Sequence, residues 1–275
     1  MSLRIQPRLS YSELDAIPYI DENNYIIPNK RYERVEQDDA NELIPSDAVI
    51  LELGGRYGTV SAVINHKLDD PTQHVVVEPD PLVQGALRYN RETHLCHFFI
   101  VNGILSGRKK YLENHGYGTF CKTEEEGNPV PNYTLEELAN VYPTKPFTHL
   151  VADCEGGLLD FFEEYPEFLQ TLRGIYFESD NQHTTILDYT PVYTKLKEWG
   201  FELKKKAGAH QYWEKGLPDT QIKRKRLTLK EIQAIPYKTE KNTILHPQSI
   251  EPEEQKDAGI KRSASFCSSG SMDCG

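Results

Sequence analysis

The sequence is poor in the features that mark secreted, membrane and zinc proteins. Its 275 residues include five cysteines, and these form no C-x-x-C pair, which argues against a zinc site and a disulfide framework. No stretch approaches 18 uncharged apolar residues, and the first residues contain no apolar signal core. Positive charge is scarce, with 31 Lys and Arg against 42 Asp and Glu. We therefore expect a soluble, cytoplasmic protein with no membrane contact and no nucleic-acid partner.

The middle of the chain alternates short apolar runs with helical patterns, which is typical of βαβ units and a parallel sheet. We expect buried strands at residues 48–53, 74–77, 97–101, 149–152 and 174–177, and helices at residues 60–67, 81–90, 135–142, 158–172 and 191–199. The stretches "FELKKK" and "HQYWEKG" predict a terminal antiparallel hairpin. The count fits one doubly wound α/β domain.

Two flanking segments resemble each other. The segment "RLSYSELDAIPYIDENNYII", residues 8–27, aligns without gaps with "RLTLKEIQAIPYKTEKNTIL", residues 226–245. Both contain a capping box, Ser10 with Glu13 and Thr228 with Glu231, so each predicts a short helix that ends before the proline. We interpret the pair as clasps that pack on one domain or close a homodimer, or as a duplicated docking element.

These features predict four parts in the chain. Residues 1–45 form an N-terminal clasp segment, residues 46–216 the central domain and residues 217–249 a C-terminal clasp segment. Residues 250–275 form a polar, Ser-rich and Gly-rich tail. Such a tail buries too little apolar area to offset the entropy of ordering, so we expect it to be disordered.

A glycine-rich junction joins the first predicted strand of the central domain to its helix. The nicotinamide fingerprint would require glycines at positions 54, 56 and 59, but the last two are Arg56 and Thr59. The remaining pattern, Glu52-x-Gly54-x-x-x-Gly58, has the spacing of S-adenosylmethionine enzymes. Glycines let the backbone approach a ligand, and an acidic residue at the strand end suits a cationic cofactor.

The next two strands end in further candidate cofactor residues. Glu78 stands at the tip of the second strand, where a carboxylate accepts hydrogen bonds from both ribose hydroxyls of a nucleoside lying across the sheet. Asn102, Gly103 and Ile104 follow the third strand and are placed to edge the adenine.

The ordered blocks resemble the FkbM-type S-adenosylmethionine-dependent methyltransferases from about residue 49 to residue 216. The blocks are "LELGGRYG", "VVVEPDP", "NGILSG", "YTLEELANVY", "HLVADCEGGLLDFF", "GIYFES" and "YTKLKEWGFEL". The resemblance implies a Rossmann-like class I methyltransferase fold, with a mostly parallel seven-stranded sheet covered by helices on both faces. It implies S-adenosyl-L-methionine as cofactor and O-methylation of a small molecule or glycan. The cofactor residues it implies are Glu52, Gly54, Gly55, Gly58, Glu78, Pro79, Asn102, Gly103, Ile104 and Asp153.

Catalysis is expected at the ends of the fourth and fifth strands. Methyl transfer is a direct displacement, so the enzyme mainly aligns the reactants. Asp153 is the first candidate to take the proton of an acceptor hydroxyl, with Glu155 beside it on the same strand face. His183, in the loop after the fifth strand, is a second candidate base.

Two alternative functions remain open. Asp153, Asp180 and Asn181 offer oxygen ligands suited to a divalent cation, as in catechol-type methyltransferases, although we expect no metal. Val151 and Leu158 stand where the family often has lysine and glutamate, which favours a catalytically weak or inactive interaction module. A chelator distinguishes the first alternative, and failure to methylate any acceptor distinguishes the second.

Overall fold

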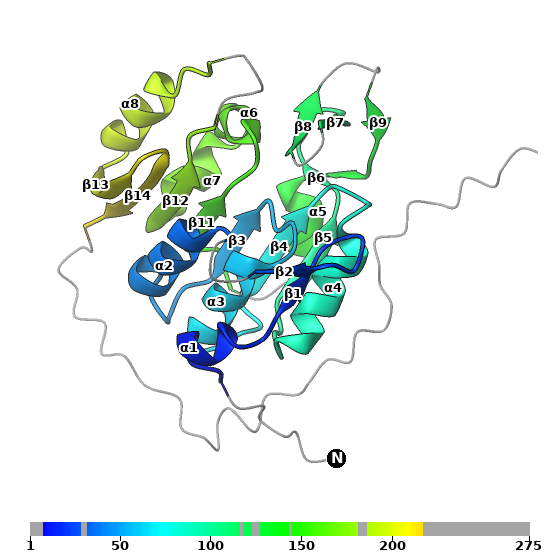
Figure 1. The fold of residues 1–275 in the computed structure, drawn as a ribbon. Helices are drawn as coiled ribbons and strands as arrows, with labels where there is room; N and C mark the ends of the chain where they lie inside the picture. The colour runs from blue at the N-terminus through cyan, green and yellow to red at the C-terminus, as the bar shows by residue number, and fades with distance from the viewer. Residues whose placement is uncertain are drawn as a thin grey trace, which may run out of the picture. The chain divides into compact units, whose positions relative to one another are not determined.

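The computed structural model describes residues 8–28, 32–115, 118–122, 127–142, 145–180 and 186–216 (Figure 1). These residues belong to one compact unit that extends from Met1 to Pro236, and a second unit, Tyr237–Gly275, lies outside the described residues. The C-terminal clasp segment and the tail are likewise outside them, so these predictions and the domain boundaries stay predictions.

A seven-stranded sheet forms the centre of the unit. Its strands lie in the order β13-β14-β12-β11-β3-β4-β5, and every pair is parallel except the two that involve β14. The predicted mostly parallel sheet is therefore confirmed, including its antiparallel terminal hairpin. The strand bounds are β3 (Ile50–Leu53), β4 (His74–Glu78), β5 (Phe99–Asn102), β11 (His149–Ala152), β12 (Gly174–Glu178), β13 (Phe201–Ala207) and β14 (His210–Lys215).

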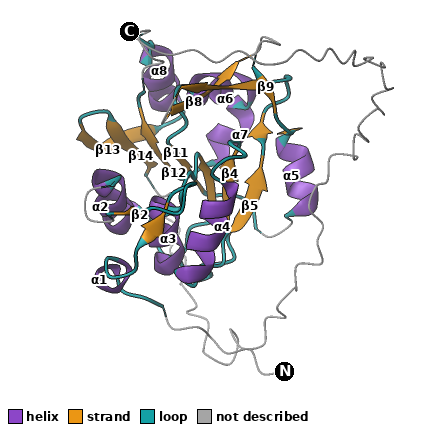
Figure 2. Cartoon of the chain, turned by 45° about the vertical axis from the view of Figure 1, so that its right-hand side comes forward, coloured by secondary structure: helices purple, strands orange, loops and turns teal. Residues whose placement is uncertain are grey.

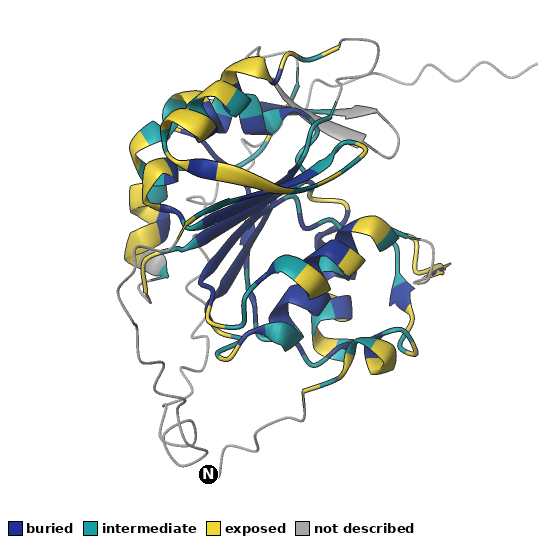
Figure 3. Ribbon diagram, turned by 90° about the vertical axis from the view of Figure 1, so that its left-hand side faces the viewer, coloured by how far each residue is buried: buried dark blue, intermediate teal, exposed yellow. Residues whose placement is uncertain are grey.

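Helices cover both faces of this sheet (Figures 2 and 3). Because side chains alternate along a strand, Ile50 packs with the helices of one face, whereas Leu51 packs with those of the other. Both are fully buried. The first face carries α2 (Arg34–Leu43), α3 (Thr59–Lys67) and α4 (Gln84–Thr93), and the second carries α5 (Leu135–Val141), α6 (Gly157–Glu164), α7 (Pro166–Thr171) and α8 (Thr190–Glu198).

The N-terminal segment packs on the first face as α1 (Tyr11–Leu14), β1 (Tyr19–Ile20) and β2 (Ile26–Ile27). The predicted capping box is present, since Ser10 and Glu13 each accept from the other's backbone N–H. Tyr19 is buried and its ring stacks on His94 at 3.8 Å between centroids. Asn90 of α4 both accepts from and donates to the backbone of Ile20 at 2.9 Å. The segment is thus part of the folded unit.

Three parts of the fold differ from the sequence prediction. Residues 104–133 contribute short strands outside the central sheet: β6 (Ile104–Leu105), β7 (Tyr111–His115), β8 (Gly118–Lys122), β9 (Asn128–Pro129) and β10 (Asn132–Tyr133). The helix expected over 158–172 is two helices, because Pro166 lacks an N–H and disfavours helical backbone at Tyr165. Helix α2 was not expected. None of the described helices has the length and apolar character to cross a bilayer.

Candidate functional site

The glycine turn after β3 is held between the ends of two neighbouring strands. The Gly54 N–H donates to the carbonyl of Val77 at 2.9 Å, and the Asp153 N–H donates to the carbonyl of Leu53 at 3.0 Å. Gly54 has a φ of +87°, and a Cβ there would lie 1.7 Å from the Asp153 backbone oxygen. Position 54 therefore requires glycine both for its backbone conformation and for this close approach.

Glu78 fixes the same turn from the end of β4. Its side chain is buried, and its two carboxylate oxygens accept from the backbone N–H groups of Arg56 and Asp80, each at 2.7 Å. Burial raises the pKa of Glu78 to about 6, although both hydrogen bonds act in the opposite direction. The carboxylate thus connects the second strand to the glycine turn.

A hollow lies at the carboxyl ends of β3, β4 and β11, beside the glycine turn. Four predicted cofactor residues line it, namely Gly54, Pro79, Gly103 and Ile104. The remaining walls are Leu53, Val77, Leu105, Cys154, Gly157 and Phe161, with Ser106, Lys110, Asp160 and Glu164 at a polar end. We call this space the hollow.

The polar end of the hollow is paired within the protein. Lys110 is buried and forms an ion pair with Asp160, and the Ser106 hydroxyl lies 2.8 Å from a Glu164 oxygen. The open part of the hollow is therefore mainly apolar, as a site for a flat heterocycle requires.

The other six predicted cofactor residues, Glu78 and Asp153 among them, are not part of the lining. Glu52 is buried, and its carboxylate contacts the Ser61 hydroxyl at 2.8 Å and His74 Nε2 at 2.7 Å. Gly55 and Gly58 face side chains of the core, Val76 and Leu87 among them.

Asn102 is exposed at the end of β5. His183 and Asn181 lie outside the described residues, so their predicted roles stay predictions.

Carboxylates gather where β11 and β12 end. Burial and the charges of Asp180, Glu33 and Glu178 raise the pKa of Asp153 well above its usual range. Burial, followed by the nearby carboxylates of Glu178 and Glu155, raises the pKa of Asp180 to about 8. Burial is also the largest cause that raises the pKa of Glu33 to about 8. Such shifts are typical of a functional site.

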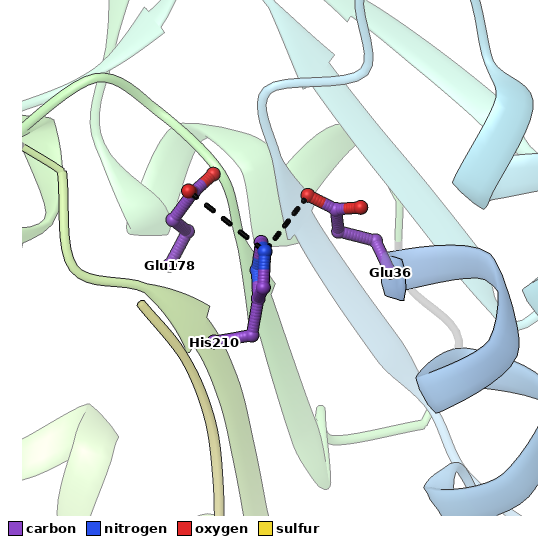
Figure 4. A group of neighbouring side chains, drawn as sticks. All are labelled: Glu36, Glu178 and His210. Atoms are coloured by element: carbon purple, nitrogen blue, oxygen red, sulfur yellow. Dashed lines mark ion pairs between the residues drawn. The ribbon is translucent and has the colours of Figure 1, made fainter. Parts of the chain in front are cut away.

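Three members of this region, Glu33, Glu36 and His210, were missed by sequence reasoning. Glu36 belongs to α2 and His210 begins β14, and they meet Glu178 at the end of β12 (Figure 4). His210 Nε2 lies 3.5 Å from a Glu36 oxygen and 3.9 Å from a Glu178 oxygen. The pairing of β12 with β14 places His210 opposite Glu178. No sequence pattern around His210 or Glu178 predicts that α2 lies beside them.

Comparisons with known proteins give fold-level likenesses. No protein-family model and no curated protein matches the chain. One similar solved structure is a precorrin-6y C5,15-methyltransferase from Geobacter metallireducens, with a TM-score of 0.41 at 14% identity, covering 67% of this chain and 87% of that one. Another is an O-methyltransferase from Bacillus cereus in complex with SAH, with a TM-score of 0.37 at 14% identity, covering 66% and 80%. A ribosomal protein L11 methylase from Lactobacillus delbrueckii has a TM-score of 0.39 at 12% identity, covering 66% and 77%.

The chain's own strand order defines its class. The strands lie in the order β5-β4-β3-β11-β12-β14-β13. Strand β14 lies between β12 and β13 and is antiparallel to both. This is a Rossmann-like class I methyltransferase fold, in which ligands bind at the carboxyl ends of the parallel strands.

Proposed function

We propose that this chain binds S-adenosyl-L-methionine and transfers its methyl group to a hydroxyl of a small molecule or glycan, as the resemblance to FkbM-type enzymes implies. The single observation that carries the proposal is the position of the hollow. It lies at the carboxyl ends of the parallel strands, beside the glycine turn and next to the carboxylates around Asp153.

The hollow fits the adenosine part of this cofactor. Pro79 and Ile104 are apolar walls suited to a purine ring, and Gly103 lines the same space. Each Glu78 oxygen already accepts one backbone N–H. A carboxylate oxygen has a second lone-pair site, so Glu78 remains able to accept a ribose hydroxyl on each side.

The carboxylates fit the cationic part. S-adenosylmethionine carries a sulfonium and an ammonium group, and Asp153, Asp180 and Glu33 repel one another when all are ionised. A bound cation relieves this repulsion and lowers the pKa of each carboxyl. The site therefore favours a positively charged ligand over a neutral one.

Asp153 is the proposed general base. The acceptor oxygen attacks the methyl carbon, the carbon–sulfur bond breaks, and its electron pair stays on sulfur to give S-adenosylhomocysteine. The hydroxyl proton passes to the Asp153 carboxylate, a step worth on the order of 10²- to 10⁴-fold in rate. Alignment of the two reactants supplies a further roughly 7 to 11 kcal/mol. Glu155, half-buried beside it, has its pKa raised by burial and by Glu178 and is the reserve candidate.

A metal-assisted variant of the same reaction has one specific observation in its favour. Asp153, Glu178 and Asp180 each offer an oxygen atom within 4.8 Å of the others. An all-oxygen set suits Mg²⁺, which would orient the acceptor hydroxyl. Loss of methyl transfer on adding a chelator, and its return with Mg²⁺, would establish this variant.

We also propose a cytoplasmic location for the reaction. Cys96 is buried and carries a free thiol, which agrees with a reducing compartment.

The cofactor claim is tested at Gly157, which lines the hollow. A Cβ at this position would meet Cys154 at 3.6 Å, an ordinary contact, so Gly157→Ala is the matched control. Gly157→Trp fills the hollow. Calorimetry should show binding of S-adenosylmethionine to the wild type and to Gly157→Ala, and at least a 30-fold loss in Gly157→Trp, about 2 kcal/mol. Equal binding by both variants would rule out the hollow as the adenosine site.

The acceptor is then sought with labelled cofactor and fractionated small molecules and glycans. Asp153→Asn should lose methyl transfer even at saturating cofactor, and the lost charge should also weaken cofactor binding. A variant that transfers methyl at the wild-type rate would remove Asp153 from the chemistry.

A further inference from the structure

We propose that Glu36, Glu178 and His210 form a binding site for a divalent transition-metal ion such as Zn²⁺. The site is separate from the all-oxygen group around Asp153 and shares only Glu178 with it. It goes beyond methyl transfer and does not depend on cofactor binding.

The spacing of the three side chains is that of ligands around a metal. One ligand atom from each residue lies within 4.8 Å of the other two. His210 Nε2 is 3.5 Å from Glu36 and 3.9 Å from Glu178, and both distances exceed those of a charge-assisted hydrogen bond, about 2.7–2.9 Å. Two ligands of a tetrahedral zinc ion lie about 3.3 Å apart, given metal–ligand distances near 2.0–2.1 Å. The two distances from His210 exceed this spacing by about 0.2 and 0.6 Å.

Glu36 supplies an independent observation. Its side chain is 10% exposed and points at His210 (Figure 4). Among the described residues it has no side-chain hydrogen-bond donor, and its neighbours are its own backbone N–H and His210 Nε2 at 3.5 Å. A buried carboxylate normally has hydrogen bonds or a bound cation to offset its desolvation. A carboxylate has about four lone-pair sites, so Glu36 retains sites for a cation beside its contacts with its own backbone N–H and His210.

The three ligands are held by rigid elements. Pairing of β12 with β14 sets Glu178 opposite His210, and the His210 ring lies parallel to the Tyr176 ring at 6.4 Å between centroids. Helix α2 is fixed over the sheet because Lys205 pairs with its Asp39 at 2.7 Å. Sites built on strands and helices hold their geometry better than sites on loops.

The ligand set selects the class of metal. An imidazole with two carboxylates suits Zn²⁺ and its neighbours in the transition series, whereas Mg²⁺ and Ca²⁺ prefer oxygen ligands alone. Three protein ligands also leave a position for water or a substrate atom, as in catalytic zinc sites.

The test is titration of the full chain with Zn²⁺ alone after dialysis against a chelator, with no cofactor present. The wild type should bind one Zn²⁺, and Co²⁺ in its place should give a visible absorption band. Glu36→Gln and His210→Asn should each weaken binding at least 100-fold, since loss of a ligand costs more than the 10- to 100-fold typical of an outer-shell change. Glu198→Gln, the same chemical change on an exposed residue of α8, should leave it unchanged.

Two further variants and measurements separate this site from others. Asp153→Asn should retain one Zn²⁺ per chain, because Asp153 belongs only to the all-oxygen group. Melting curves of the metal-free variants identify any that fail to fold, and a misfolded His210→Asn leaves Glu36→Gln to decide. Wild-type affinity in Glu36→Gln, or a Co²⁺ band that persists in His210→Asn, would overturn the proposal, as would absence of Zn²⁺ binding by the wild type at micromolar concentration.

Discussion

Replacing Glu78 by glutamine separates two opposing contributions of one buried carboxylate to the free energy of unfolding, namely its hydrogen bonds and its burial. The wild-type side chain is 4% exposed and accepts the N–H groups of Arg56 and Asp80, each at 2.7 Å. Glutamine has one acceptor oxygen, so its amide N–H₂ would face one of these donors. A buried donor left without a partner costs about 1–3 kcal/mol.

The wild-type carboxylate carries a cost of its own when it ionises. Burial raises the pKa of Glu78 from 4.5 to about 6, and each pKa unit is worth about 1.4 kcal/mol. Between pH 4.5 and pH 6 the folded state therefore holds more protons than the unfolded state. The free energy of unfolding falls by about 2 kcal/mol as the pH rises through this window and is level above it.

Glutamine does not titrate, so the difference between the two proteins isolates Glu78. We expect Glu78→Gln to be less stable than the wild type by about 1–3 kcal/mol at pH 4, and this gap to shrink by about 2 kcal/mol at pH 7.5. Urea denaturation followed by the fluorescence of buried Trp213 measures both values. A gap that stays constant, or that widens with pH, would show that the two hydrogen bonds outweigh burial and would refute the reasoning.

Three further predictions follow from the same structure. Gly54→Ala should lower the free energy of unfolding by about 3 kcal/mol or more, because its Cβ would lie 1.7 Å from a backbone oxygen; Gly85→Ala, in a helix with open space around it, should be neutral or stabilising in the same urea assay. Ser10→Ala removes the cap of α1 and should cost about 1 kcal/mol, seen as faster amide exchange in the N-terminal segment, and unchanged exchange would contradict the cap. Affinity for S-adenosylmethionine should rise between pH 6 and pH 9, because a cation binds the ionised forms of Glu33 and Asp180, whose pKa values are both raised to about 8; calorimetry in buffers of different ionisation enthalpy should show proton release, and pH-independent affinity would argue against a cationic ligand there.

The parts of the fold that local sequence determines were predictable. Apolar runs bounded by turns gave the position of each parallel strand to within two or three residues, as at β11, which spans residues 149–152 as expected. The spacing of Ser10 and Glu13 gave the start of α1. The glycine spacing gave the turn that follows β3, because Gly54 and Gly58 both have positive φ.

The parts of the fold that depend on contacts between distant residues could not be predicted from the sequence. Helix α2 has a polar sequence in which half of the side chains are charged, and it is fixed by ion pairs such as Lys205–Asp39 rather than by an apolar stripe. Its position over β12 and β14 is what brings Glu36 to His210. The prediction that Glu52 binds the cofactor depended only on its position near the end of a strand. In the structure its carboxylate contacts Ser61 and His74.

The gathered carboxylates carry the strongest physical argument for a cationic ligand. Glu33, Glu36, Asp153, Glu178 and Asp180 come from α2 and from segments that follow or end two different strands, so their proximity is a property of the fold and not of neighbouring positions in the chain. The pKa values of four of them, Glu33, Glu36, Asp153 and Asp180, are raised, which means that their ionisation destabilises the folded protein. A cation bound among these acids would offset this cost, and the two proposals divide that role: a sulfonium at Asp153, and a metal ion where Glu36 and His210 meet.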